Sequence, residues 1–211
     1  LFLQNFFWGT FPFFGESWSL AVEEWFYFLI PLSLFILRHK RVSLRKSIII
    51  VIASVFIISF LARIIKLTSI NIDHFDLFFW NKAINFVVLT RLDCILLGVL
   101  GAYIMKTRSE MWKNKKNKFA IIGLVLLVAQ YTLYFYSWDC ENNFGKVYLT
   151  LFATTMRCIP YLFMLPFFHQ LSTGKGIVYQ TVSYISIVSY SLYLVNLTLT
   201  RLVFERISIP V

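Results

Sequence analysis

Six apolar stretches, each long enough to cross a lipid bilayer, constrain this chain more than any other feature. They lie at residues 17–37, 47–65, 86–105, 119–137, 147–169 and 183–204. A helix of about 20 apolar residues crosses the hydrocarbon core of a bilayer, and helices satisfy their own backbone hydrogen bonds there. We therefore predict an all-α fold, a polytopic transmembrane helix bundle of about six spans.

The composition supports a membrane protein. Hydrophobic residues make up 59% of the chain and charged residues 14%, whereas a soluble domain carries about 25% charged residues. The net charge of +10 does not indicate a nucleic-acid partner, because Lys and Arg stand in short runs between the apolar stretches. We find no repeat or linker and expect one membrane domain over residues 1–211, with the bilayer as its surroundings.

The basic residues also predict an orientation. Loops 38–46 and 106–118 contain five and six Lys and Arg residues, whereas four lie on the opposite side. By the positive-inside rule these two loops are cytoplasmic, in a multi-pass protein of the plasma (inner) membrane. The three cysteines show no CxxC spacing, so we expect neither a disulfide framework nor a metal site.

Several charged or polar residues lie within the apolar stretches, where each is costly and needs a reason. Glu23 and Glu24 in the first stretch and Arg91 and Asp93 in the third are predicted about 8–10 Å below the outer surface. Two further polar residues in the later stretches are Arg157 and Asn196. A structural ion pair and a polar working cavity are equally good interpretations of these charges alone.

Other residues have simpler interpretations. Arg63 and Arg201 stand near predicted helix ends, where we expect their side chains to reach the membrane surface. Ser19 precedes Glu23 by four residues and shares its helix face. Gly98 and Gly101 are expected to allow close helix packing.

Three segments resemble motifs of the acyltransferase-three family. The segment 17–31, SWSLAVEEWFYFLIP, resembles the family signature WSLxVEExFYxxxP. Residues 90–98, TRLDCILLG, resemble its xRxDxLLxG helix, and residues 187–194, IVSYSLYL, resemble its late ISYSLYLxH helix. The three motifs occur in the family's order, and the resemblance extends over essentially the whole chain.

The resemblance implies a membrane O-acyltransferase that moves an acyl group, usually acetyl, from acyl-CoA to a hydroxyl of a cell-surface or exported carbohydrate. No tightly bound cofactor is implied. Glu23, with Glu24 as second choice, would orient a base or the acceptor, and Arg91 would stabilise negative charge. Asp93 would position Arg91. The expected substrate-binding residues are Ser19, Asp93, Arg157, Tyr193 and Asn196.

Two departures from the family pattern affect this interpretation. The early family helices, which carry a basic residue and a His that serves as candidate base, have no counterpart in this sequence. Asn196 stands where the family commonly has His. We therefore expect the later part of a larger enzyme, inactive on its own. A membrane transporter or channel and a catalytically inactive acyltransferase-like bundle remain the alternatives.

Overall fold

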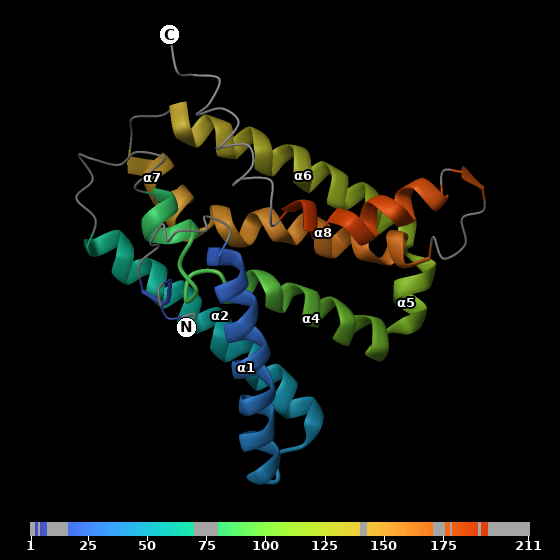
Figure 1. Cartoon of the computed structure of the whole chain (residues 1–211), viewed down its shortest axis with the longest axis horizontal. Coiled ribbons are helices and arrows are strands. Elements are labelled where there is room, and N and C mark those ends of the chain that lie inside the picture. The colour runs from blue at the N-terminus through green and yellow to red at the C-terminus, as the bar shows by residue number, and fades with distance from the viewer. Residues whose placement is uncertain are drawn as a thin grey trace.

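The computed structural model describes residues 3, 5–7, 17–69, 80–139, 143–170, 176–177, 179–189 and 191–193. Its described residues form helices and no strand, which confirms the predicted all-α fold (Figure 1). The elements are α1 (Ser17–His39), α2 (Leu44–Ser69), η2 (Asn81–Asn85, a π-helical turn), α4 (Leu92–Thr107), α5 (Ser109–Asn114), α6 (Lys116–Asp139), α7 (Asn143–Leu151) and α8 (Ala153–His169).

Three helices within the described part of the chain are long and apolar enough to cross a membrane. They are Trp18–His39, Leu44–Ser69 and Lys116–Ser137. A fourth span is obtained if α7 and α8, which meet at a bend of 57°, count together. The prediction of about six spans is therefore not confirmed. In the third stretch the α-helix begins only at Leu92, and most of the sixth stretch lies outside the described residues.

Helices α6 and α8 run side by side, and α4 packs along the other flank of α8 (Figure 1). Gly123 permits the first contact, because a Cβ there would lie 2.6 Å from Met164 Cγ and 2.9 Å from the Pro160 carbonyl oxygen. Gly101 permits the second, since a Cβ there would lie 2.9 Å from Leu162 Cδ1. The predicted packing role of Gly101 is therefore confirmed.

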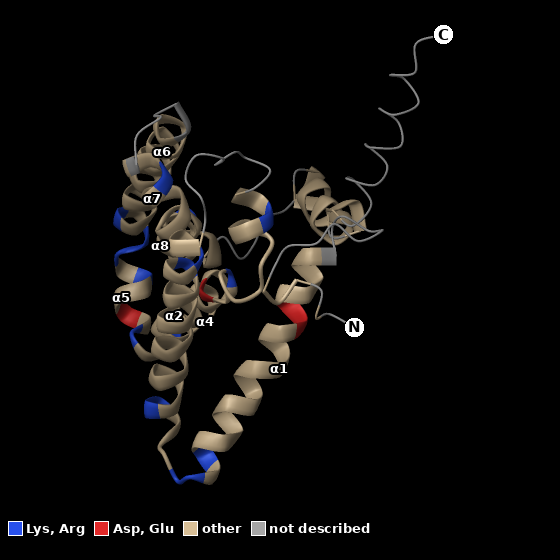
Figure 2. Ribbon diagram, turned by 90° about the vertical axis from the view of Figure 1, so that its left-hand side faces the viewer, with Lys and Arg blue, Asp and Glu red and all other residues tan. Residues whose placement is uncertain are grey.

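Helices α1 and α2 form a hairpin that is joined by a short basic loop, and α1 leans away from the other helices (Figure 2). Their outward faces are strongly apolar, as expected for helices that face lipid chains. Examples of exposed large side chains are Phe28 and Phe35 on α1, Ile57 and Ile65 on α2, and Val125 and Val128 on α6.

Two interruptions of the helical backbone meet inside the bundle. Residues 86–91 separate η2 from α4, and Phe152 separates α7 from α8. A buried cluster joins Trp80, Ala83 and Ile84 before the first break to Tyr148, Leu149 and Ala153 around the second. The Trp80 indole N–H also donates to the Leu149 carbonyl, 3.1 Å away. Irregular backbone at membrane depth is tolerated where protein buries it, and both breaks meet that condition.

Candidate functional site

Arg63 of α2 is one of the two most buried charged groups that the structure describes, with an exposed fraction of 1%. Its Nη2 lies 2.7 Å from both carboxylate oxygens of Asp93 in α4. Its Nε and Nη2 donate to the Thr90 carbonyl oxygen at 3.1 and 2.6 Å. Arg63 therefore neutralises Asp93 and also satisfies a backbone carbonyl in the first break.

The remaining guanidinium nitrogen of Arg63 reaches the second break. Its Nη1 donates to the Leu151 carbonyl oxygen at 3.1 Å and to Thr155 Oγ1 at 2.6 Å. The Thr155 hydroxyl in turn donates to Asp93 Oδ2. Arg63, Thr90, Asp93, Leu151 and Thr155, which we call the Arg63 cluster, connect α2, α4, α7 and α8 through one planar cation.

Two predictions about these charges are wrong. Arg63 does not extend to the membrane surface, because α2 continues to Ser69 and leaves Arg63 inside the helix, facing α4. Asp93 does not pair with Arg91, because Arg63 and Thr155 bind its carboxylate. The signal available in the sequence was that an Arg and an Asp in two different apolar stretches neutralise each other if the helices are neighbours.

Arg91 faces α1 instead. Its Nη1 donates to Asn85 Oδ1 at 2.8 Å, and its guanidinium carbon lies 5.4 Å from the centre of the Trp18 ring. Beneath this contact, Ala21 and Val22 of α1 pack against Val88 and Leu92. The structure thus brings together the first and second sequence motifs, which are separated by some sixty residues in the chain.

Glu23 lies one residue beyond the buried pair of α1 and is half-buried, whereas Glu24 is exposed. Neither carboxylate forms an ion pair with another described residue, because the one pair among them is Arg63 with Asp93. Ser19 is half-buried one helical turn before Glu23. The turn that carries these residues and the half-buried Arg91 form what we call the outer site.

A third polar group surrounds Arg157 of α8. Its guanidinium carbon lies 4.6 Å from the centre of the Tyr134 ring on α6. Gln130 of α6 and the Tyr148 hydroxyl of α7 lie near it. Gln130 and Tyr148 are each only 7% exposed. The Arg157 Nη2 and the Gln130 amide have no hydrogen-bond partner among the described residues. These polar groups were not predicted together, since they come from three helices.

The other predicted site residues are less informative. Tyr193 is 43% exposed at the edge of the described part of the chain, and Asn196 lies outside the described residues. No group of three or more His, Cys, Asp or Glu residues that could hold a metal ion occurs among the residues the structure describes.

Comparison with known proteins gives two findings. A family model described as an acyltransferase domain matches residues 1–210. The chain is also similar to O-acetyltransferase OatA of Staphylococcus aureus strains COL and MRSA252, at 32% identity over 145 residues. That match covers 65% of this chain and 22% of each relative, so the chain spans about a fifth of their length. No solved structure matches the chain.

Proposed function

The chain belongs to the acyltransferase-three family, and we propose that it transfers an acyl group from acyl-CoA to a hydroxyl of a cell-surface or exported carbohydrate. Acetyl is the group we propose, because the similar proteins are named as O-acetyltransferases. We propose no tightly bound cofactor. The apolar helices support an integral membrane protein, and its placement in the plasma membrane with several spans, about six in all, is part of the proposal.

The observation that carries the proposal is the outer site. A hydroxyl that attacks a thioester needs a base to take its proton and donors for the negative charge that develops on oxygen. Arg91 has five N–H donors, of which one binds Asn85. The guanidinium carbon lies 5.4 Å from the centre of the Trp18 ring, which places the cation beside α1. We assign Arg91 to the charge on the reacting group.

Glu23 is the carboxylate of this site that we assign to the reaction, with Glu24 as second choice. Glu23 is half-buried on α1 next to residues that pack against the start of α4. From there it can orient the base or accept a hydrogen bond from the acceptor hydroxyl. Ser19 lies on the same face one turn earlier, which supports a contact with the acceptor.

The roles of the remaining predicted residues follow from their surroundings. Both carboxylate oxygens of Asp93 have protein partners, so we reassign Asp93 from substrate binding to positioning of α4. Arg157 keeps its proposed role as a donor to substrate, since its Nη2 has no described partner. Tyr193 and Asn196 remain proposed substrate-binding residues.

The proposed orientation follows the basic loops. Figure 2 shows Lys and Arg gathered at the loop between α1 and α2 and around α5. With loops 38–46 and 106–118 cytoplasmic, the outer site lies toward the opposite surface, because Arg91 stands at the end of α4 farthest from loop 106–118. A carbohydrate that has been exported would then approach the outer site from its own side of the membrane.

Because we expect this chain to be inactive on its own, the test is acyl transfer in membranes that carry the full-length protein, with labelled acetyl-CoA and the host's surface carbohydrate. We expect Glu23→Gln and Arg91→Ala each to lower transfer by about 100-fold, the scale of an acid–base or charge-stabilising group. Glu110→Gln and Arg45→Ala are matched controls, because both side chains are exposed and belong to the basic loop regions. Full activity in correctly inserted Glu23→Gln and Arg91→Ala variants would remove these assignments.

The same preparation separates the proposal from its competitors. A transporter would move solutes across proteoliposomes without consuming acetyl-CoA. An inactive acyltransferase-like bundle would do neither. Turnover of acetyl-CoA that depends on Arg91 is the result that only the proposed function predicts.

A further inference from the structure

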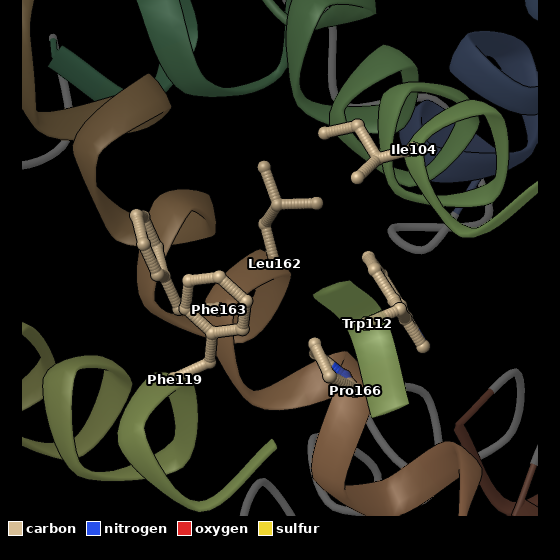
Figure 3. A pocket seen from close by; sticks show the side chains of 6 residues that line it. All are labelled: Ile104, Trp112, Phe119, Leu162, Phe163 and Pro166. Atoms are coloured by element: carbon tan, nitrogen blue, oxygen red, sulfur yellow. The ribbon is translucent and has the colours of Figure 1, made fainter. Parts of the chain in front are cut away.

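Three adjoining cavities surround Trp112, at the end of the bundle where α5 crosses from α4 toward α6. The largest, of about 500 Å³, extends along Gly98, Ala102 and Met105 of α4 and Leu165 of α8. A second, of about 120 Å³, is lined by the indole and five other apolar side chains (Figure 3). A third, of about 380 Å³, opens at Ser109 and Lys113. Trp112 lines all three, and we call them together the Trp112 groove.

The inner part of the groove is apolar. In Figure 3 the Trp112 ring lies near Ile104 of α4 and Leu162 and Pro166 of α8, and the six residues that line this cavity are all apolar. Gly98 lies at the far end of the groove on α4. The space beside it is open, since a Cβ added there would meet nothing within 4 Å. The prediction that Gly98 serves close helix packing is therefore wrong, in contrast to Gly101.

The opening of the groove is polar and cationic. Ser109, Lys113, His169 and Gln170 line it, and Gln170 Nε2 lies 3.4 Å from the Trp112 carbonyl oxygen, which holds α5 against the end of α8. Segment 106–118 contains six Lys and Arg residues and one acidic residue, Glu110. The Trp112 indole Nε1 is buried with no hydrogen-bond partner among the described residues.

An apolar channel with a cationic opening is complementary to an amphiphile with an anionic head. Basic pockets between transmembrane helices at the cytoplasmic surface are places where phospholipid head groups bind, and Trp is common at that depth. A cavity of about 500 Å³ lies within the range of binding pockets. In the proposed orientation the opening lies at the cytoplasmic surface, because α4 ends at Thr107 and α6 begins at Lys116.

We propose that the Trp112 groove binds one anionic phospholipid. Its phosphate lies against Lys113, and the Trp112 indole N–H donates to a phosphate or ester oxygen. One acyl chain runs along α4 between Met105 and Gly98. Gly98 follows Arg91 by seven residues, or about 10 Å of helix, so the groove is separate from the outer site. The proposal does not rest on the acyl-transfer activity.

Binding is measured on the purified protein by native mass spectrometry, with phosphatidylglycerol and phosphatidylcholine of the same acyl chains added in parallel. We expect saturable binding of phosphatidylglycerol in preference to phosphatidylcholine. Lys113→Gln should weaken phosphatidylglycerol about fivefold, the effect of one cationic side chain near a membrane surface, and weaken phosphatidylcholine less, because its choline already offsets the phosphate charge. Lys40→Gln, an exposed lysine in the other basic loop, is the matched control and should have no effect.

The channel is tested separately from the charge. Gly98→Phe places a ring in the open space beside Gly98 and should remove binding of both lipids while the protein keeps its thermal unfolding temperature. Gly98→Leu and Ala102→Phe serve as second variants should Gly98→Phe not fold. Equal binding of the two lipids, unchanged binding in Lys113→Gln, or tight binding in the folded Gly98 variants would each overturn the proposal. Preference for a long-chain acyl-CoA over phosphatidylglycerol would overturn the identity of the occupant.

Discussion

Replacing Arg63 tests the central structural finding, that one cation holds two backbone breaks and Asp93 together. Arg63→Met keeps an apolar stem of similar length and removes the guanidinium. Asp93, which is 1% exposed, then loses its ion-pair partner, and the Thr90 carbonyl loses both donors from Arg63. Removing one partner of a buried ion pair costs about 3–5 kcal/mol, a large share of the about 5–15 kcal/mol that stabilises a typical protein.

A double substitution separates the charge from the backbone contribution. If Arg63→Met and Asp93→Leu acted independently, together they would cost about 6–10 kcal/mol. Because the pair Arg63→Met/Asp93→Leu leaves no charge unpaired, we expect only the smaller cost of the Thr90 and Leu151 carbonyls that lose their Arg63 donors, about 1–3 kcal/mol each. The Thr90 carbonyl has no substitute donor in the helix, since the Cys94 amide N–H donates to the Arg91 carbonyl oxygen.

The assay is reversible unfolding in detergent or bicelles, followed by helical circular dichroism. Ile65→Ala is the control, because Ile65 lies two residues from Arg63 and is 64% exposed. A single Arg63→Met variant within about 1 kcal/mol of that control would refute the structural role, since substitutions outside such features fall in this range. Additive single and double substitutions would refute the pairing with Asp93.

Two further predictions concern packing and the outer site. Gly123→Ala should destabilise the protein by about 1–3 kcal/mol, because its Cβ would lie 2.9 Å from the Pro160 carbonyl oxygen. Gly98→Ala should be neutral or stabilising by up to about 1 kcal/mol; equal unfolding temperatures for the two variants would contradict this. Asn85→Ala removes the hydrogen bond that holds Arg91 and should lower acetyl transfer about tenfold, less than Arg91→Ala, without changing the unfolding temperature; transfer assays with matched protein amounts check this ranking.

The spans that could be predicted from the sequence are those in which the helix is continuous. The stretches at 17–37, 47–65 and 119–137 correspond to α1, α2 and α6, because an uninterrupted apolar run in a bilayer has no good alternative to a helix. The stretch at 86–105 is equally apolar, yet its first six residues are not helical. Hydropathy does not distinguish a membrane helix from irregular backbone that other helices bury.

The pairing of charges could not be predicted for a related reason. An Arg near the end of a stretch has two stable outcomes, extension to the membrane surface or burial beside an acid, and neighbouring helices decide between them. Asp93 has Arg91 two residues away, which made that pair look natural. Arg91 precedes the first residue of α4 and has non-helical backbone angles, however, so Asp93 faces Arg63 while Arg91 faces Trp18.

The opposite directions of Asp93 and Arg91 connect the stability of the bundle to its candidate chemistry. Because Arg63 binds the Thr90 carbonyl, the helix of α4 begins at Leu92, and Arg91 is its N-terminal flanking residue with non-helical backbone angles, φ −124° and ψ −13°. If α4 extended in the N-terminal direction to include Thr90, Arg91 would lie within a regular helical turn and away from Asn85. The contact of Arg63 with the Thr90 carbonyl therefore fixes where α4 starts, and the start of α4 fixes where the guanidinium of Arg91 meets α1. Arg63, which lies outside the outer site, therefore sets the position of Arg91 within it.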